Sequence, residues 1–243
     1  MQVVRNYGSL LIELSKVVPD GIVVFFPSYG FMKDLIVEWN QKGILEEILK
    51  HKLIFVETKD IAQTTNAMSH FRDACKSGRG AIFLSVARGK VAEGVDFKNY
   101  LGRCVVIIGI PFQYSKSKPL LCRMEYVEKK FGISNKDFLT FDAMRQCSQC
   151  LGRVIRSKAD YGLMILADRR FSKEDKVEKL PEWICKRIEP GSRDMQLDVS
   201  IQKAKQFFRQ MGQPVRLTED LFVSRNEAIP DKIQFGRNSH PNN

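Results

Sequence analysis

Polar and charged side chains recur through residues 145–156 (RQCSQCLGRVIR) at intervals that would place them on one side of an α-helix. That side would carry Arg145, Gln149, Gly152, Arg153 and Arg156. The opposite side would be apolar, with Met144, Cys147, Leu151, Val154 and Ile155. Arginine stays charged and directs paired N–H groups at phosphate oxygens, so the pattern indicates an anion site with a buried back. An ordinary amphipathic surface helix has the same pattern, and the rest of the chain has to decide between the two.

A second stretch that could form a functional site is residues 85–97 (SVARGKVAEGVDF), which combine glycines, a basic pair and two acids. Glycine lets backbone amides approach a phosphate or a ribose closely. Residues 88–90 (RGK) resemble the end of a phosphate-binding P-loop, but that motif needs a glycine where Leu84 stands and a serine or threonine where Val91 stands. The chain contains no P-loop elsewhere and no evident acidic magnesium-binding strand end. We therefore do not expect a self-sufficient nucleotide hydrolase.

The elements that must position these residues follow from short apolar runs that alternate with helical patterns. Buried strands are predicted at residues 22–26, 53–56, 81–86, 105–110 and 161–167. Helices are predicted at residues 6–17, from the break at 27–30 to about 49, at 61–76, about 119–131, about 137–156 and 196–211, with a further helix starting at Pro181. Residues 168–179 are predicted to be a charge-rich loop. This alternation predicts an α/β fold with a mostly parallel sheet.

Three unusual loops are predicted to follow strands of that sheet, at residues 27–29, 87–97 and 111–118. Ligands of parallel α/β sheets bind beyond the carboxyl ends of the strands. We expect the three loops to meet at one edge, and their shared location indicates a site more strongly than any single loop.

Composition bounds the possible partners of the chain. Its 243 residues carry a formal charge of 39 − 28 = +11, which favours a polyanion, with nucleic acid first. No apolar run reaches the length of a membrane span and the N-terminus lacks a signal-peptide layout, so we expect no membrane partner and a nuclear or cytoplasmic protein. The cysteines are scattered and form a single CxxC, at Cys147 and Cys150, so we predict reduced thiols and no metal site.

Three ordered stretches together resemble helicase motifs IV, V and VI of superfamily 2. They are residues 21–29 (GIVVFFPSY), 85–97 and 149–156 (QCLGRVIR). The segment EGVDF and the pattern QxxGRxxR resemble those of the XPD branch of iron–sulfur DNA helicases. Residues 138–145 (FLTFDAMR) and 161–168 (YGLMILAD) strengthen that match. The resemblance runs from about residue 4 to about residue 214.

The resemblance implies a RecA-like α/β domain, the second motor domain of such a helicase, at residues 1–212, with a tail at 213–243 that we predict to be disordered. The first motor domain of the family carries the Walker A and B motifs, the iron–sulfur ligands and the arch insertion, and this sequence has none of them. ATP with Mg²⁺ would bind between the two motor domains. The cysteines of this chain are therefore not assigned to a cluster.

The same resemblance implies roles at the ATP site. Arg153 and Arg156 match the motif VI arginines that reach the γ-phosphate, an interaction worth roughly 10³–10⁵ in rate in phosphoryl-transfer enzymes. Gln149 would orient that site. Glu93 and Asp96 match motif V acids that contact the nucleotide or couple it to DNA.

Further roles are implied along the DNA path. Ser28 and Tyr29 match the end of motif IV and would contact the phosphate backbone, and Arg88 and Gly89 would lie in the coupling loop or the DNA track. Gly152 is assigned with the nucleotide-binding residues. Purely structural roles stay open as alternatives for three of these positions. Asp96 could be a loop-capping carboxylate, Tyr29 a packing residue, and Gly152 a point where the helix and a partner approach closely.

We therefore expect the motor half of an ATP-dependent 5′→3′ DNA helicase, with the isolated chain inactive. By resemblance, it would act in nucleotide excision repair and transcription initiation, in the nucleus, on DNA at single-strand/duplex junctions. Its partners would be subunits of the transcription factor TFIIH, including a regulatory subunit at the C-terminal part. The apolar stripe of residues 197–211 is expected to pack on its own sheet instead. The alternative is a non-enzymatic module that binds nucleic acid or docks into a complex.

Overall fold

The computed structural model describes residues 2–155, 160–189 and 191–212. The chain divides into two units, Met1–Met211 and Gly212–Asn243. Apart from Gly212, the second unit lies outside the described residues, and so does the predicted tail at 213–243. The elements below all belong to the first unit.

Five parallel strands form one sheet in the order β2-β3-β1-β4-β5. They are β1 (Gly21–Phe26), β2 (Leu53–Val56), β3 (Ala81–Val86), β4 (Cys104–Ile108) and β5 (Leu163–Ala167). Every residue of β1, β3 and β4 is buried, which explains why these strands are continuously apolar. The predicted α/β parallel sheet is confirmed.

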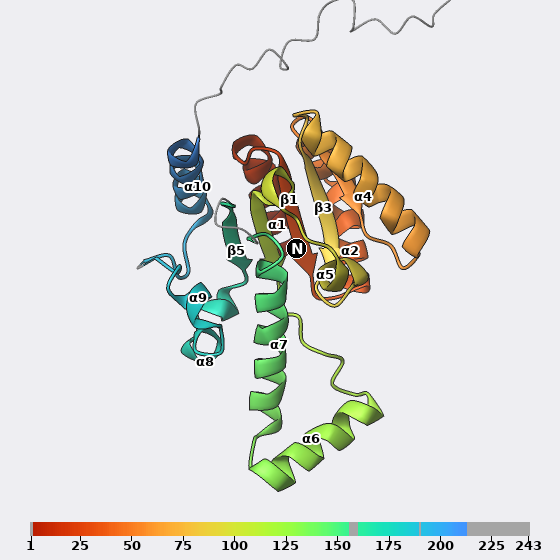
Figure 1. The fold of residues 1–243 in the computed structure, drawn as a ribbon, viewed down its shortest axis with the longest axis vertical. Helices are drawn as coiled ribbons and strands as arrows, with labels where there is room; N and C mark the ends of the chain where they lie inside the picture. Colours follow the sequence, from red (N-terminus) through yellow and green to blue (C-terminus); the bar gives the residue numbers. More distant parts are fainter. Residues whose placement is uncertain (1, 156–159, 190, 213–243) are drawn as a thin grey trace, which may run out of the picture. The chain divides into compact units, whose positions relative to one another are not determined.

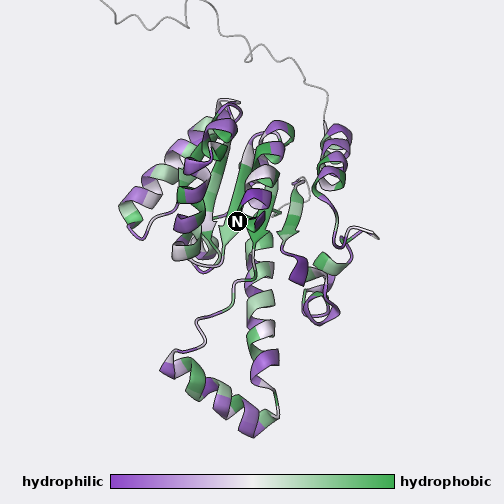
Figure 2. Ribbon diagram, turned by 180° about the vertical axis from the view of Figure 1, so that it is seen from behind, coloured by the Kyte–Doolittle hydropathy of each residue, from purple (hydrophilic) through white to green (hydrophobic). Residues whose placement is uncertain are grey.

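Helices cover both faces of the sheet (Figure 1). One face packs against α1 (Gln2–Val17), α2 (Tyr29–Gln41), α3 (Ile44–Leu49) and α10 (Leu197–Met211). The other face packs against α4 (Ile61–Lys76), α5 (Lys90–Gly94) and α7 (Asn135–Leu151). Alternate strand residues supply the two cores, which Figure 2 shows as hydrophobic strands between helices of mixed character. As predicted, the apolar stripe of α10 joins the core on its own sheet, through Ile201, and α10 also contacts α1.

The remaining elements lie after β3. They are η1 (Asn99–Gly102), α6 (Lys118–Phe131), η2 (Arg169–Ser172), α8 (Glu174–Val177) and α9 (Glu182–Cys185). Figure 1 shows α6 beyond the N-terminal end of α7, away from the sheet. Among the helices in the described ranges, none is long and apolar enough to span a bilayer.

Three element predictions need correction, and the third, the end of α7 (Asn135–Leu151), is described with the site below. The helix predicted to continue to residue 49 is interrupted at Gly43, whose φ of +69° is the left-handed conformation that glycine tolerates, so α2 and α3 are separate. The predicted loop at 168–179 contains η2 and α8. Asp168 caps η2 by accepting a hydrogen bond from the Arg170 amide at 2.9 Å, whereas α8 begins after Lys173 without a side-chain cap. Helices of four residues are too short to show apolar periodicity.

Candidate functional site

The carboxyl ends of β1, β3 and β4 meet at one edge of the sheet, as the parallel register requires, with Phe26 beside Val86. The three predicted loops leave from this edge, so their expected shared location is confirmed. Ser28 begins α2 there, and its hydroxyl accepts a hydrogen bond from the Phe31 amide at 3.2 Å. Ser28 is thus a helix cap in this structure, and its predicted contact with a phosphate backbone stays a prediction.

A buried carboxylate, Glu57, organises the centre of this edge although the sequence-based site does not include it. It directly follows β2 and is only 1% exposed. Its oxygens accept hydrogen bonds from the Tyr29 hydroxyl at 2.8 Å and the Ser85 hydroxyl at 2.6 Å. The backbone amides of Val86 and Val91 add bonds at 3.0 and 3.4 Å. A buried carboxylate needs such donors to offset its lost hydration. These residues form the Glu57 cluster.

The Glu57 cluster explains two of the predicted site residues. Burial, and then the hydrogen bond to Glu57, raises the pKa of Tyr29 to about 12. Tyr29 therefore stays a neutral donor at neutral pH. A Cβ atom at Gly89 would lie 2.5 Å from Oε1 of Glu57, so only glycine lets the loop approach the carboxylate. Tyr29 thus ties the start of α2 to Glu57, and Gly89 lets the motif V loop lie close to the same carboxylate.

A second carboxylate, Asp142 of α7, gathers the groups around Arg88. The Arg88 guanidinium lies 2.6 Å from one oxygen of Asp142 and also donates to the Pro111 carbonyl at 2.9 Å. The Gln113 amide donates to the same carboxylate oxygen at 2.6 Å, and Arg145 donates to the other at 3.1 Å. Burial alone would raise the pKa of Asp142, but hydrogen bonds from Arg145 and Arg88 outweigh it and hold the pKa below its ordinary value. These residues form the Asp142 cluster.

The third group surrounds Arg153, immediately after α7. Its guanidinium lies 3.2 Å from the Asp96 carboxylate and donates to the Glu93 carbonyl oxygen at 2.6 Å. Its own carbonyl accepts a hydrogen bond from the Phe97 amide at 2.9 Å. Asp96 thus forms an ion pair with motif VI. The Glu93 side chain is exposed, and its backbone oxygen makes the contact with Arg153.

The prediction of one helix through residues 145–156 is wrong beyond Leu151. The chain caps α7 at Gly152 and then turns, with the Arg153 amide bonded to the Cys150 carbonyl at 3.2 Å. Arg145 and Arg153 therefore do not share a helix face. A Cβ at Gly152 would meet, within the described residues, only carbonyl oxygens of its own helix, and the alternative that Gly152 allows close approach of a partner stays a prediction. Arg156 lies outside the described residues.

Helix α7 also joins motifs V and VI through its buried side. The Gln146 amide, only 4% exposed, donates to the Ala87 carbonyl. Gln149, on the last turn, is exposed. The thiols of Cys147 and Cys150 are buried, and burial raises the pKa of both above the ordinary thiol value. Their CxxC spacing therefore belongs to the packed back of the helix.

The structure separates the predicted site residues into two regions. Ser28, Tyr29, Arg88 and Gly89 lie at the carboxyl edge of the sheet, whereas Arg153 pairs with the later part of motif V. Sequence reasoning missed Glu57 and Asp142. Glu57 had a usable signal, since a charged residue directly after a buried strand falls at the ligand-binding edge. Asp142 had none, because two of its three partners, Arg88 and Gln113, come from distant segments.

Comparison with protein families gives a match to the helicase C-terminal domain over residues 11–187. Among curated relatives, the general transcription and DNA repair factor IIH helicase subunit XPD of Arabidopsis thaliana is 55% identical over 87% of this chain and 28% of its own length. The XPD/RAD3 subunit of Saccharomyces cerevisiae is 53% identical over 87% of this chain and 27% of its own length. A regulator of telomere elongation helicase 1 homolog from Drosophila yakuba is 32% identical over 89% of this chain and 22% of its own length.

Solved structures agree on the fold. A structure titled XPD helicase matches 76% of this chain and 31% of its own, with a TM-score of 0.53 and 23% identity. A structure titled XPD apo matches 72% of this chain and 34% of its own, with a TM-score of 0.55 and 24% identity. The predicted RecA-like fold and the predicted resemblance to XPD-type helicases are confirmed, and the relatives do not favour the non-enzymatic alternative. The chain spans less than a third of the length of the curated relatives named above.

Proposed function

The chain belongs to the helicase C-terminal domain family, and we propose on that basis that it works as the C-terminal motor half of an ATP-dependent 5′→3′ DNA helicase of the XPD type. In such an enzyme a first motor domain would supply the phosphate-binding loop, and this chain would supply arginines and coupling loops to the shared ATP site. Because this sequence contains no P-loop, we expect the isolated chain to hydrolyse no ATP.

The way Arg153 is held carries the proposal. Its side chain is 19% exposed, and two of its N–H groups are engaged by Asp96 and by the Glu93 carbonyl. Its buried Nε atom has no partner among the described residues. We propose that the two contacts aim the guanidinium and that the second N–H group of each terminal nitrogen, not the buried Nε, meets the γ-phosphate. A cation held in place before the reaction stabilises developing phosphoryl charge without reorganisation.

Other residues of motif VI complete the proposed role. Gln149 is exposed on the last turn of α7, where it would orient the same phosphate. Arg156 would be the second arginine of the site. Gly152, between them, is assigned with the nucleotide-binding residues, together with Glu93 and Asp96.

ATP is the proposed substrate, and Mg²⁺ would enter with it. Among the described residues, His, Cys, Asp and Glu form no group of three that could hold a metal ion. The proposal therefore assigns no magnesium ligand to the described part of the chain. The scattered cysteines do not fit an iron–sulfur cluster, and no step is assigned to one.

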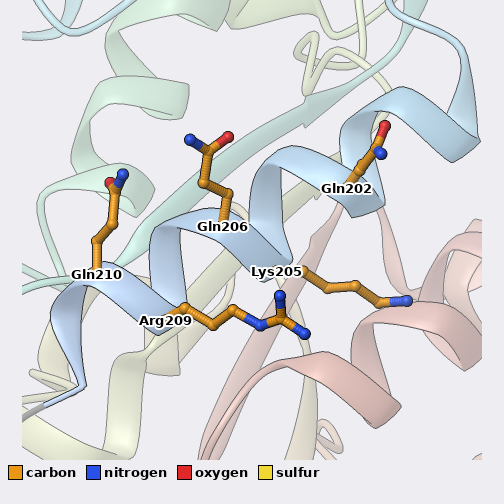
Figure 3. Close-up of a pocket in the computed structure, with 5 residues that line it drawn as sticks. All are labelled: Gln202, Lys205, Gln206, Arg209 and Gln210. Atoms are coloured by element: carbon orange, nitrogen blue, oxygen red, sulfur yellow. The ribbon is translucent and has the colours of Figure 1, made fainter.

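The proposed partners are DNA at a single-strand/duplex junction and other subunits of TFIIH, which implies the nucleus. The charge of +11 supports the first, and the names of the relatives support the second. A regulatory subunit would meet the C-terminal part, where the buried side of α10 is already used by its own core. Its outward side is polar, as Figure 3 shows. That side carries Gln202, Lys205, Gln206, Arg209 and Gln210.

The test supplies the first motor domain of an XPD-type helicase as a separate protein and measures ATP hydrolysis with single-stranded DNA. We expect hydrolysis only when both halves are present. Arg153→Ala should then abolish hydrolysis while DNA binding survives. Arg193→Ala, which removes an exposed arginine paired with Glu174, is the matched control and should hydrolyse ATP normally. Normal turnover in Arg153→Ala would overturn the assignment.

A further inference from the structure

Glu57 and Arg153 lie in different parts of the site, and the one-turn helix α5 connects them. The carboxylate of Glu57 bonds to the start of α5, and the guanidinium of Arg153 bonds to its end. Glu57 lies outside the three helicase motifs, whereas α5 belongs to motif V and Arg153 to motif VI. Figure 1 shows α5 at the carboxyl end of β3, and α5 contacts both β3 and α7. The order of these contacts gives Glu57 a route to the proposed catalytic arginine.

The two oxygens of Glu57 hold both ends of the loop that enters α5. One oxygen accepts a hydrogen bond from the Val86 amide, at the end of β3, at 3.0 Å. The other accepts from the Val91 amide, in α5, at 3.4 Å. The residue before α5 is Gly89, which has no side chain to cap the first turn. The acceptor that a capping side chain normally supplies therefore comes from Glu57, which follows another strand.

The far end of α5 carries the groups that hold Arg153. The Glu93 carbonyl, two residues after Val91, accepts a hydrogen bond from the guanidinium at 2.6 Å. The Asp96 carboxylate lies 3.2 Å from the same guanidinium. The turn is closed by the bond from the Val95 amide to the Val91 carbonyl at 3.0 Å. Because Val91 is buried in a close-packed core, any shift of the first turn is passed on to the Glu93 carbonyl.

The Cys150 thiol gives independent evidence that the two ends of this route are close together. Burial raises the pKa of this thiol most strongly, and a hydrogen bond from Gln146 opposes that effect. The charges of Arg153 and Arg88 also lower the pKa, whereas the charge of Glu57 raises it. One sulfur atom on the last turn of α7 is thus within electrostatic range of both Glu57 and Arg153.

We propose that Glu57 is a positioning residue for Arg153 and that it acts by fixing the first turn of α5. The helix then presents the Glu93 carbonyl and the Asp96 carboxylate to the guanidinium before a phosphate arrives. Preorganised charge needs no reorganisation during the reaction, and a misplacement of about 1 Å can lower a rate about 10²-fold. The catalytic consequence rests on the proposed function, whereas the hold on the guanidinium is a property of this chain alone.

The first test follows the Arg153 guanidinium by NMR in the full 243-residue chain labelled with ¹⁵N-arginine. Its Nε–H group is buried, so we expect a signal protected from hydrogen exchange, which Arg153→Lys removes and thereby assigns. Glutamine has one acceptor oxygen where glutamate has two, so it cannot serve both Val86 and Val91. We expect Glu57→Gln to shift this signal and to speed its exchange about tenfold, as loss of one hydrogen bond to a charged group does.

The controls for lost stability are Ile48→Val and Ile48→Ala. Ile48 is 1% exposed in the core on the opposite face of the sheet, and its two truncations should bracket the Tm of Glu57→Gln. Both leave α5 in place, so the Arg153 signal should keep its position in each. Glu57→Asp keeps the charge but is one methylene shorter. It should change the signal as Glu57→Gln does, and it replaces that variant if the glutamine form does not fold.

The second test measures the two-protein ATPase reaction with single-stranded DNA. We expect Glu57→Gln to lower kcat by about tenfold to a hundredfold while the KM for ATP changes little, because the loss falls on an interaction made in the transition state. Ile48→Val should retain the kcat of the unsubstituted chain. A merely structural role of Glu57 would lower the amount of folded protein and would leave the kcat of the folded fraction unchanged.

Four outcomes would overturn the proposal. They are absence of a protected Arg153 signal in the unsubstituted chain, an unchanged signal in the Glu57 variants, an equal change in the Ile48 variants, and an intact kcat in Glu57→Gln. If the two unsubstituted halves together hydrolyse no ATP, the proposed function fails. The NMR comparison would still decide whether Glu57 positions Arg153, because it needs neither ATP nor the other motor domain.

Discussion

The Arg88 guanidinium and the Asp142 carboxylate lie 2.6 Å apart although 54 residues separate them in the chain. The contact ties the loop of motif V to the helix that leads into motif VI. Gln146 ties the same two parts again through the Ala87 carbonyl. Arg88, which the sequence assigns to the coupling loop or the DNA track, is therefore held by α7, and the two motifs are mechanically joined.

Removal of the Asp142 charge should weaken this joint in a pH-dependent way. Because its pKa is lowered in the folded state, Asp142 contributes stability above its unfolded pKa of about 3.9, and that stability is lost as the pH falls through the folded pKa. Asp142→Asn should cost about 1–3 kcal/mol of unfolding free energy at neutral pH, and the difference from the unsubstituted chain should shrink below about pH 4. Urea unfolding across this pH range measures it.

The control for this prediction is Asp73→Asn, at an exposed position of α4. It should leave the unfolding free energy almost unchanged. A pH-independent cost of Asp142→Asn would show that the carboxylate charge does not form the joint.

Glu57→Gln tests whether a buried carboxylate holds the edge of the sheet. The amide keeps the shape of the side chain but places an N–H₂ group among donors from Tyr29, Ser85 and the backbone. We expect a loss of about 1–3 kcal/mol in unfolding free energy. Glu128→Gln, at an exposed residue of α6, should be nearly neutral by the same denaturation measurement. Equal stability of the two variants would contradict the central role of Glu57.

Gly89→Ala should destabilise the chain because its Cβ would lie 2.5 Å from the Glu57 carboxylate. Relief requires movement of the loop or of Glu57, and overpacking of this kind costs about 1–3 kcal/mol. Gly94→Ala is the matched control, since its Cβ meets no atom of the described residues within 4 Å. In thermal unfolding followed by circular dichroism, we expect Gly89→Ala to have a lower Tm than the unsubstituted chain. The Tm of Gly94→Ala should equal or exceed that of the unsubstituted chain.

Arg153→Lys separates charge from geometry at the proposed ATP site. Lysine keeps the charge, but it is a single point donor and cannot span Asp96 and the Glu93 carbonyl as the planar guanidinium does. In the two-protein ATPase assay we expect a fall in kcat approaching that of Arg153→Ala, whose loss should be roughly 10³-fold or more. An intact kcat would mean that charge alone is sufficient and that the observed hold on the guanidinium has no catalytic importance.

Much of the fold was predictable because it rests on contiguous residues. The runs at 22–26, 53–56 and 81–86 each gave a strand within one residue of its observed bounds. The end of α4 followed from Gly78, which adopts the left-handed conformation with a φ of +75°. The failures were also local. The break at Gly43 and the end of α7 at Leu151 lie inside stretches whose apolar spacing continues, so periodicity alone could not reveal them.

The sequence by itself determined the five strands, the order of the three motifs and the apolar back of α7, because these depend on neighbouring residues in one segment. The tertiary structure alone decided which polar atoms meet. Tyr29 reaches Glu57 across β3, because β1, β3 and β2 are parallel neighbours that end at one edge of the sheet, and Arg88 reaches Asp142 because α7 packs against the loop after β3. Local sequence does not encode strand order or helix docking, and these long-range choices give Tyr29 and Arg88 their carboxylate partners.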